Sequence, residues 1–502
     1  MLRKIRLILA VAFISIITLL FLDFTGTIHA WFGWMTKIQF LPALLALNVG
    51  IVLFLLALTF MFGRIYCSVI CPLGVFSDIL ARIGKAGKKL PYSYSPEMSW
   101  LRYGVLAVFI LAMVMGFNSA VALLAPYSSY GRIVNNLFNP LWLWGNNMLA
   151  YLAERANSYA FYETEVWMKS LSTLVIALVT FLILAVLAFR NGRTYCNTIC
   201  PVGTLLGFVS RFSLFRFTID TDKCNNCGLC ARRCKAACIN PREHKIDNSR
   251  CVVCMNCVDN CQREAITYKP VWMVRKKSDE KLEQTINLSR RRALSATILT
   301  AMAGTLKAQE KKIKNVEMKK DGGLAPIKER KAPLRQTPLA PPGALSVRNM
   351  TQHCVACQLC VTVCPNQVLS PSDSLMTLMQ PEMSYERGYC RPECVKCSEV
   401  CPAGAIRPIT KADKSAIQIG HAVWLKEYCV VNTDGVECGN CARHCPTEAI
   451  QMIAINQDDK TSHKIPVINT ERCIGCGACE NLCPSRPYSA IYVEGHLVHR
   501  II

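Results

Sequence analysis

The chain has 502 residues, 29 cysteines and a formal net charge of +23. This length predicts several domains. The charge does not indicate nucleic-acid binding, because it is concentrated in a linker without a basic and aromatic binding face and suits a solvated tether beside an anionic membrane surface. Many cysteines follow the run C-x2-C-x2-C-x3-C, which is the ligand spacing of bacterial ferredoxins and differs from disulfide frameworks and zinc knuckles.

Residues 1–215 predict a helical membrane domain with four spans. The apolar runs lie at 7–22, 41–62, 101–117 and 171–189, each near the length that a bilayer core requires. The first run follows a basic start, and because no small-x-small site comes closely after it, we expect a retained span rather than a cleaved signal. Basic residues are concentrated in the loop between the second and third runs, which places the N-terminus and the end of the fourth span inside.

An internal repeat follows the second and fourth apolar runs. The pattern Gly-Arg-x-Tyr-Cys-x3-Cys-Pro-x-Gly begins at Gly63 and again at Gly192. Residues four apart lie on one face of a helix, so each copy presents two sulfurs together. The four cysteines are Cys67, Cys71, Cys196 and Cys200. They are either buried thiols of tight helix-end packing motifs or thiolates at the inner membrane face, serving as redox thiols or as metal ligands.

Residues 216–270 predict a small cytosolic module with two [4Fe–4S] clusters. In such modules the fourth cysteine of each run binds the other cluster. The crossed assignment gives one cluster to Cys224, Cys227, Cys230 and Cys261, and the other to Cys251, Cys254, Cys257 and Cys234. Lys235 and Gln262 stand where proline usually follows the fourth cysteine, and Cys238 is a spare thiol that competes as a ligand.

A charged connector, 271–289, leads to a segment that resembles an export signal. Arg290 and Arg291 begin a twin-arginine pattern, and a short apolar run and the small-x-small sequence at Ala301–Ala303 follow. Residues 290–306 are therefore expected to be an internal signal cut after Ala303, or a fifth, short crossing. The proline- and lysine-rich stretch 307–347 predicts a disordered tether.

Residues 348–502 predict an exported domain with four more clusters. The 16 ligands are Cys354, Cys357, Cys360, Cys364, Cys390, Cys394, Cys397, Cys401, Cys429, Cys438, Cys441, Cys445, Cys473, Cys476, Cys479 and Cys483. Proline follows the fourth cysteine of every run. Short strands are expected at Ala405–Ile406, Ala449–Ile450 and Ala490–Tyr492. Spacing does not show whether the first run crosses with the second or with the fourth.

No motif in the chain predicts a self-contained catalytic site. A dinucleotide fingerprint, a P-loop and a haem-binding Cys-x-x-Cys-His are all absent from the sequence. Six [4Fe–4S] clusters instead predict an electron wire, with the substrate chemistry on a partner. No residue stands out as the proton acceptor of a quinol, and Asp23 and His29 are only outer-side candidates. The expected fold is a four-span α-helical membrane domain with α+β ferredoxin-like modules, one with two clusters and one with four.

The motifs resemble two known families joined in one chain. Residues 1–270 are similar to the NapH family, with its membrane spans, two Cys-x3-Cys-Pro motifs and cytosolic ferredoxin module. Residues 287–502 are similar to the NapG family, with its twin-arginine signal and four cluster-binding runs. The resemblance implies a quinol dehydrogenase component of a periplasmic nitrate reductase system in the bacterial inner membrane, with residues 216–289 cytosolic and 307–502 periplasmic.

The same resemblance implies the partners. Electrons enter from the quinone pool and leave to a periplasmic reductase or a c-type cytochrome, and the twin-arginine machinery exports the folded C-terminal domain. Two alternatives stay open: a NosR-like supply of electrons to another respiratory reductase, and a membrane redox sensor.

Overall fold

The computed structural model describes residues 2–86, 92–158, 160–271, 330–456 and 462–502. The predicted twin-arginine segment 290–306 lies outside the described residues, as does nearly all of the connector. The expected cleavage after Ala303 is therefore still a prediction.

The first 214 residues form a helical bundle. Its helices are α1 Leu2–Leu22, α2 Thr27–Phe32, α3 Trp34–Lys37, α4 Phe40–Leu45, α5 Val49–Phe62, α6 Tyr66–Val69, α7 Pro72–Ala86, α8 Ser99–Val114, α9 Asn118–Leu124, α10 Pro126–Ile133, the π-helix η1 Val134–Phe138, α11 Asn139–Arg155, α12 Leu171–Asn191, α13 Thr194–Thr198 and α14 Pro201–Ser210. Among the described residues, α1 and α12 are long and apolar enough to cross a membrane by length and composition. This is weak support for membrane association, and the four-span arrangement stays a prediction.

The second predicted span is two helices rather than one. Helix α4 ends at Leu45, and α5 starts anew three residues after Ala46, with the Asn48 side chain accepting a hydrogen bond from the Ile51 N–H. An asparagine in this position satisfies one of the N–H groups that a helix start leaves free. Helix α5 alone has 14 residues, which is shorter than an ordinary span.

The two copies of the repeat fold alike. Gly63 ends α5 and Gly192 ends α12, both with a positive φ (75° and 71°) that suits glycine. A short helix with the first cysteine follows in each copy, and then Pro72 or Pro201 begins the next helix. Proline suits a first helical position because its missing N–H has no partner there.

The cytosolic module predicted for residues 216–270 is built from short antiparallel pairs. Strand β1 Phe215–Ile219 pairs with β4 Ile266–Pro270, and β2 Ile239–Asn240 pairs with β3 Lys245–Ile246. The one-turn helices α15 Leu229–Arg232 and α16 Asn256–Asp259 carry one cysteine each. Strand ends thus hold the cysteine loops in place.

The C-terminal domain repeats this design. Its strand pairs are β5 Leu369–Pro371 with β6 Pro381–Met383, β7 Ile417–Trp424 with β10 Ile491–Ile501, and β8 Ile450–Ala454 with β9 Lys464–Ile468. Its helices are α18 Val347–His353, α19 Leu359–Thr362, α20 Lys396–Val400, α21 Lys411–Ala416, the 3-10 helix η2 Lys426–Tyr428, α22 Val430–Thr433, α23 Asn440–Arg443 and α24 Ala478–Asn481. Two of the three expected strands are present, starting at Ile450 and Ile491, whereas Ala405–Ile406 lies in no strand.

The prediction of a disordered tether up to residue 347 is wrong for its last part. Residues 330–346 form an extended strap on the C-terminal domain, and α18 begins at Val347. The Lys331 N–H donates to the Pro487 carbonyl at 2.9 Å, and Leu339 is buried. Proline-rich composition predicts disorder only where no surface is present to pair with the backbone, and here the folded domain supplies one.

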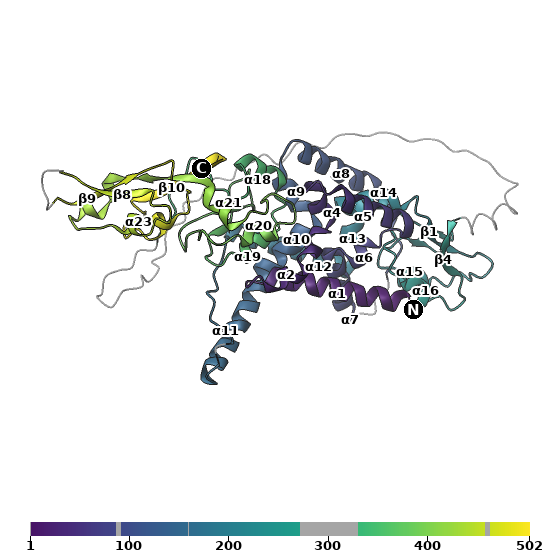
Figure 1. Ribbon diagram of the computed structural model, residues 1–502. Helices are drawn as coiled ribbons and strands as arrows, with labels where there is room; N and C mark the ends of the chain where they lie inside the picture. Colours follow the sequence, from purple (N-terminus) through teal and green to yellow (C-terminus); the bar gives the residue numbers. More distant parts are fainter. Residues whose placement is uncertain (1, 87–91, 159, 272–329, 457–461) are drawn as a thin grey trace, which may run out of the picture.

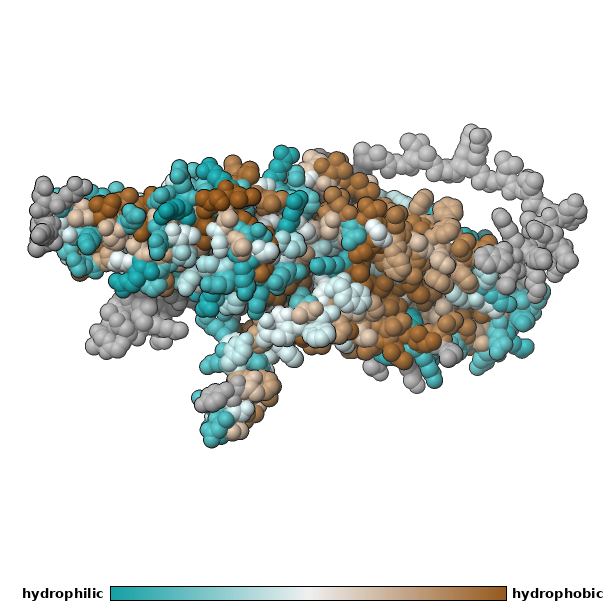
Figure 2. All heavy atoms as spheres, in the orientation of Figure 1, coloured by the Kyte–Doolittle hydropathy of each residue, from teal (hydrophilic) through white to brown (hydrophobic). Residues whose placement is uncertain are grey.

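The molecule is elongated, with the helical bundle between two polar ends. The module with β1 and β4 lies at one end of the bundle, and the C-terminal domain lies at the other (Figure 1). The surface over the bundle is largely hydrophobic, and hydrophilic residues gather at both ends (Figure 2). The C-terminal domain is docked by hydrogen bonds from Ser170 to Asp373 (2.7 Å) and from Lys396 to the Thr25 carbonyl (2.9 Å).

Candidate iron–sulfur sites

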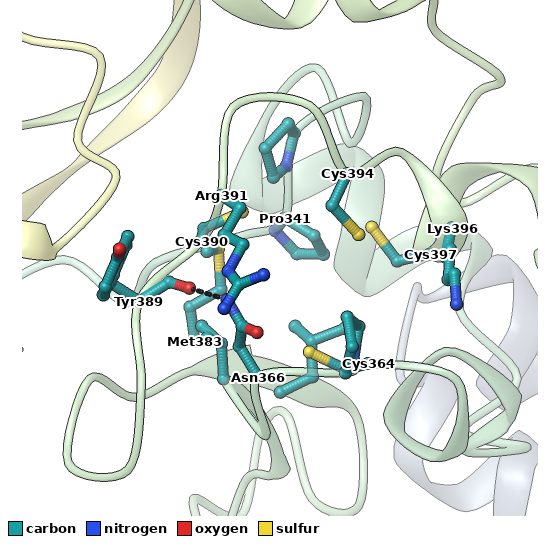
Figure 3. Close-up of a pocket in the computed structure, with 14 residues that line it drawn as sticks. Pro341, Cys364, Asn366, Met383, Tyr389, Cys390, Arg391, Cys394, Lys396 and Cys397 are labelled. Carbon is teal, nitrogen blue, oxygen red and sulfur yellow. Dashed lines mark hydrogen bonds between the residues drawn. The ribbon is translucent and has the colours of Figure 1, made fainter. Parts of the chain in front are cut away.

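The first two cysteine runs of the C-terminal domain cross with each other. Cys364, the last cysteine of the first run, lines one cavity with Cys390, Cys394 and Cys397 of the second (Figure 3). We call this set of four cysteines site B. The sequence left the pairing of the runs open, and the packing of α19 against α20 determines it.

The remaining cysteines of these two runs form site A, which comprises Cys354, Cys357, Cys360 and Cys401. Cys401 lies within electrostatic range of the other three. Burial raises the pKa of Cys357 to about 12, and the charge of Cys401 acts in the same direction. Thiols buried in this way ionise readily only when a metal ion stabilises the thiolate, which fits a cluster.

The third and fourth runs cross in the same manner. Cys445 acts electrostatically on Cys473 and Cys476, and Cys483 acts on Cys441. Site C comprises Cys429, Cys438, Cys441 and Cys483, and site D comprises Cys473, Cys476, Cys479 and Cys445. The Cys390 N–H donates to the Cys476 carbonyl at 2.9 Å, so sites B and D adjoin through the backbone.

In the module of residues 216–270 the spare thiol lies inside a cavity that predicted cluster ligands line. Cys234, Cys238, Cys251, Cys254 and Cys257 line that cavity together. The two sulfurs of Cys234 and Cys238 are 3.6 Å apart, and Cys238 is fully buried. The hydrogen bond with Cys238 lowers the pKa of Cys234 to about 7, although burial opposes this change. Cys238 therefore contacts the sulfur of a predicted ligand, and both thiols remain available as ligands.

The other predicted site of this module is more open. Cys227 is exposed, and Cys224 and Cys230 are partly buried. Cys224 and Cys227 both act electrostatically on Cys230, so the three lie close together. The participation of Cys261 stays a prediction.

The repeat brings its four cysteines together in the bundle. Each of Cys67, Cys71, Cys196 and Cys200 is 5% exposed, and each copy's sulfurs are in electrostatic range of the other copy's. The arginines of the two copies are exchanged. Arg64 donates to the Cys196 carbonyl at 3.1 Å, and Arg193 donates to the Cys67 carbonyl at 2.5 Å. The copies are thus related by an approximate two-fold axis, which the sequence repeat alone did not reveal.

The charges around these four thiols are unbalanced. Arg193 is paired with Asp78 through two hydrogen bonds of 2.8 Å. Arg64 is 0% exposed, and among the described residues it meets only neutral acceptors such as Asn197 Oδ1 and the Ser249 carbonyl. A buried cation without a partner is costly. Four thiolates around an iron–sulfur core would supply the missing negative charge.

None of these cysteine groups is arranged to hold a single metal ion, as far as the described residues show. The residues present fit [4Fe–4S] clusters, because the cysteine runs follow the ferredoxin ligand spacing.

The outer-side quinol candidates have a structural role. The Asp23 carboxylate accepts hydrogen bonds from Thr25, and from the backbone N–H groups of Gly26, Ile28 and His29. Burial opposes ionisation of Asp23, but these hydrogen bonds and the side chain of His29 outweigh it and hold its pKa well below the usual range. Such a carboxylate is a weak proton acceptor.

Comparison with known families confirms the ferredoxin-type domains. Models described as a 4Fe–4S binding domain match residues 44–91 and 173–220, which contain the two copies of the repeat, and residues 244–267. A model described as a 4Fe–4S dicluster domain matches residues 435–486. No solved structure matches the chain.

Several curated proteins are similar to parts of the chain. The methylamine utilization ferredoxin-type protein MauM of Methylobacillus flagellatus is 33% identical over 166 residues, which are 32% of this chain and 70% of that protein. MauM of Paracoccus denitrificans is 31% identical over 36% of this chain and 77% of its own length. The ferredoxin-type protein NapG of Escherichia coli is 31% identical over 29% of this chain and 65% of its own length. The chain therefore belongs to the family of ferredoxin-type iron–sulfur electron-transfer proteins that includes MauM, and it is related to NapG.

Proposed function

We propose that this chain is a membrane-bound electron conduit that takes electrons from the quinol pool and delivers them to a periplasmic reductase. The membrane half acts as a NapH-type component and the C-terminal half as a NapG-type component, fused through the linker. The C-terminal domain reaches the periplasm by the twin-arginine route, because its clusters are assembled in the cytosol and it must cross the membrane folded.

The continuous succession of thiol groups carries this proposal. At one end, Arg64 of the repeat bonds to the Ser249 carbonyl in the cytosolic module, and the Arg193 N–H bonds to the carbonyl of Lys235, the residue after Cys234. At the other end, α10 packs against site A, where a side chain at Gly131 would lie 2.7 Å from the Cys357 carbonyl. The buried thiols of the repeat lie between these contacts, in the helical bundle, whose surface is largely hydrophobic (Figure 2).

The number of clusters follows from this succession. Two clusters in the cytosolic module and four at sites A to D make six. The four thiols of the repeat would hold a seventh, which is supported by the match of residues 44–91 and 173–220 to a 4Fe–4S domain model and by the unpaired charge of Arg64. This choice replaces the alternatives of structural thiols and redox thiols.

Proteoliposomes test the electron donor. Purified protein with its full iron content is mixed with a reduced short-chain menaquinol, and the bleaching of the visible cluster absorption is followed. We expect reduction of the clusters that depends on the quinol. Full-length protein that retains its clusters but is not reduced by menaquinol, with or without a periplasmic reductase, would remove the quinol from the proposal.

The final acceptor is tested separately. The resemblance to the NapG family favours periplasmic nitrate reduction, whereas MauM is named for methylamine utilization. A deletion strain that respires nitrate at the wild-type rate but fails to grow on methylamine would move the conduit to the second pathway. The expected result is loss of nitrate respiration that a plasmid copy restores.

A further inference from the structure

A groove of about 680 Å³ lies where the helical bundle meets the C-terminal domain. Three segments that are distant in the sequence form it: the start of α11, residues 162–169 before α12, and the loop after Cys364. Its size lies within the range of pockets for small organic ligands. Phe24 follows α1 and Leu174 belongs to α12, so the groove opens at the same end of both candidate membrane helices.

The walls of the groove suit an aromatic ring with an apolar tail. Phe24 and Tyr162 pack edge to face with ring centroids 5.8 Å apart, and Trp167 is held from behind by Arg387, which lies 4.4 Å from its ring centroid. Leu141 of α11 and Leu171 of α12, the helices that supply Leu143 and Leu174 to the groove, are 68% and 63% exposed. An isoprenoid tail would find a hydrophobic path there from the bilayer.

Three buried polar atoms of residues that line this groove have no hydrogen-bond partner. The side-chain carbonyls of Asn139, a residue that is 4% exposed, and of Gln367 accept no hydrogen bond, and Lys169 Nζ donates none. The neighbouring amides are satisfied, since Asn135 donates to the Gln358 carbonyl and Asn136 to the Arg132 carbonyl. Unpaired buried acceptors and an unpaired buried donor call for a ligand that supplies groups of both kinds.

The groove shares a wall with site B. Cys364, Asn366 and Lys396 line both the groove and the cavity of site B (Figure 3). A ring bound in the groove would therefore be separated from a cluster at site B by little more than the Cys364 ligand. The sequence did not predict that the groove and site B lie next to each other.

The second large cavity has a different chemistry. It lies between α1, α7 and the module of residues 216–270 and has a volume of about 670 Å³. It is lined by five basic side chains, Arg3, Arg6, Arg82, Arg233 and Lys235, and by the Asp78 carboxylate, which pairs with Arg6 and Lys235. This charged lining does not suit a neutral ring. It serves as the internal comparison for the groove.

Resting on the proposed function, we infer that the groove is the quinol-oxidation site of this protein. The quinol hydroxyl donates to the Asn139 carbonyl, and the quinone oxygen that forms accepts from Lys169. One quinol loses two electrons and two protons and becomes one quinone. The electrons pass singly to two oxidised [4Fe–4S] clusters, first at site B and then at a neighbouring site, and the protons leave to the outer water. Quinol electrons thus enter in the outer half of the conduit.

A labelling and binding experiment tests the site directly. Full-length protein with its clusters, in lipid nanodiscs, is photolabelled with an azido-menaquinone of short tail, and the labelled peptides are identified by mass spectrometry. Affinity for the unlabelled quinone is measured by equilibrium dialysis for wild type, Asn139→Leu, Lys169→Met and Lys169→Arg. Arg82→Ala in the basic cavity is the matched control, and iron content verifies folding.

The expected label lies on residues 162–169 and on the start of α11. Asn139→Leu and Lys169→Met each weaken binding at least about tenfold, Lys169→Arg restores most of it, and Arg82→Ala binds as wild type. Label on the basic cavity, or wild-type affinity in both groove variants, contradicts the proposed site. If menaquinol still reduces the clusters of such unaffected variants, the groove is not the quinol site, but the proposed conduit function is retained. If quinone binds in the groove but quinol reduces no cluster, the proposed conduit function is wrong, and the groove remains a quinone-binding site.

Discussion

At the scale of single residues, spacing predicts the ferredoxin-type cysteines but not the hydrogen bonds around them. The ligand assignments stay predictions that rest on the intervals a cluster requires. Spacing did not show that Cys238 lies 3.6 Å from Cys234, since this depends on the turn between α15 and β2. It also did not show the exchange of Arg64 and Arg193 between the two repeats, because each makes its bond to a carbonyl more than 120 residues away.

The Cys238 thiol is expected to tune a cluster rather than hold it. Replacing Cys238 by serine should leave the iron content at the wild-type value and shift the reduction potential of one cytosolic cluster, because hydrogen bonds to ligand sulfurs affect the potential. Iron analysis and a potentiometric titration followed by electron paramagnetic resonance measure the two effects. Loss of about four iron atoms per chain would show instead that Cys238 is the ligand. Cys479→Ser is the positive control, expected to lose or convert one cluster.

The strap on the C-terminal domain is anchored by one buried ion pair. Arg335 Nη2 lies 2.5 Å from Glu480 Oε1, and Glu480 is 2% exposed. Arg335→Met should lower the free energy of unfolding by about 3 kcal/mol, because the Glu480 carboxylate is left buried without its partner. Glu480→Gln in the same chain should recover most of this loss. Thermal unfolding measures both.

The loss in Arg335→Met should also depend on pH. Burial raises the pKa of Glu480 above its ordinary value of 4.5 even with Arg335 present, and removal of the arginine raises it further. A carboxyl group with a raised pKa destabilises the fold once it is ionised, so the difference from wild type should shrink as the pH falls from neutral towards that raised pKa. A difference independent of pH would indicate lost packing instead.

At the scale of elements, the sequence predicted helices and strands best where local residues determine the ends of each element. The repeat shows this, since Gly63 and Pro72, or Gly192 and Pro201, determine where helices end and begin. Hydropathy did not reveal the break before α5, because the residues around Asn48 are as apolar as those of a continuous span. Sequence patterns did not predict the strap or the groove either, since each is assembled from segments that meet only in the folded chain.

The last glycine of each repeat is required because a backbone carbonyl lies too close to leave room for a side chain. A Cβ atom at Gly74 would lie 2.3 Å from the Cys67 carbonyl oxygen, and one at Gly203 would lie 2.3 Å from the Cys196 carbonyl oxygen. Gly74→Ala or Gly203→Ala should destabilise the bundle by about 1–3 kcal/mol. Gly104→Ala in α8 is the matched control, because nothing lies within 4 Å of its added methyl group and alanine favours a helix. Melting temperature in detergent distinguishes them, and equal melting of all three would contradict the packing argument.

At the scale of the whole molecule, the arrangement of two polar ends around a hydrophobic belt predicts two compartments. In spheroplasts, added protease should cleave residues 348–502 and spare residues 216–270, because only the first domain is expected outside. Inverted membrane vesicles should give the opposite pattern. Protection of both domains in spheroplasts would show that the C-terminal domain is cytosolic and that the export interpretation is wrong.

The position of the repeat thiols has an electrical consequence. They lie between the module of residues 216–270 and site A. In the proposed membrane orientation, an electron that travels the full series would therefore move along the direction in which a membrane potential acts. Moving one charge through the whole potential corresponds to about 2.3 kcal/mol per 100 mV. With the inside negative, the potential would favour reduction of sites A to D by the clusters of residues 216–270. Imposing a potassium diffusion potential on sealed proteoliposomes should therefore redistribute electrons between the clusters at the two ends. The fraction of reduced clusters at each end would then follow the membrane potential.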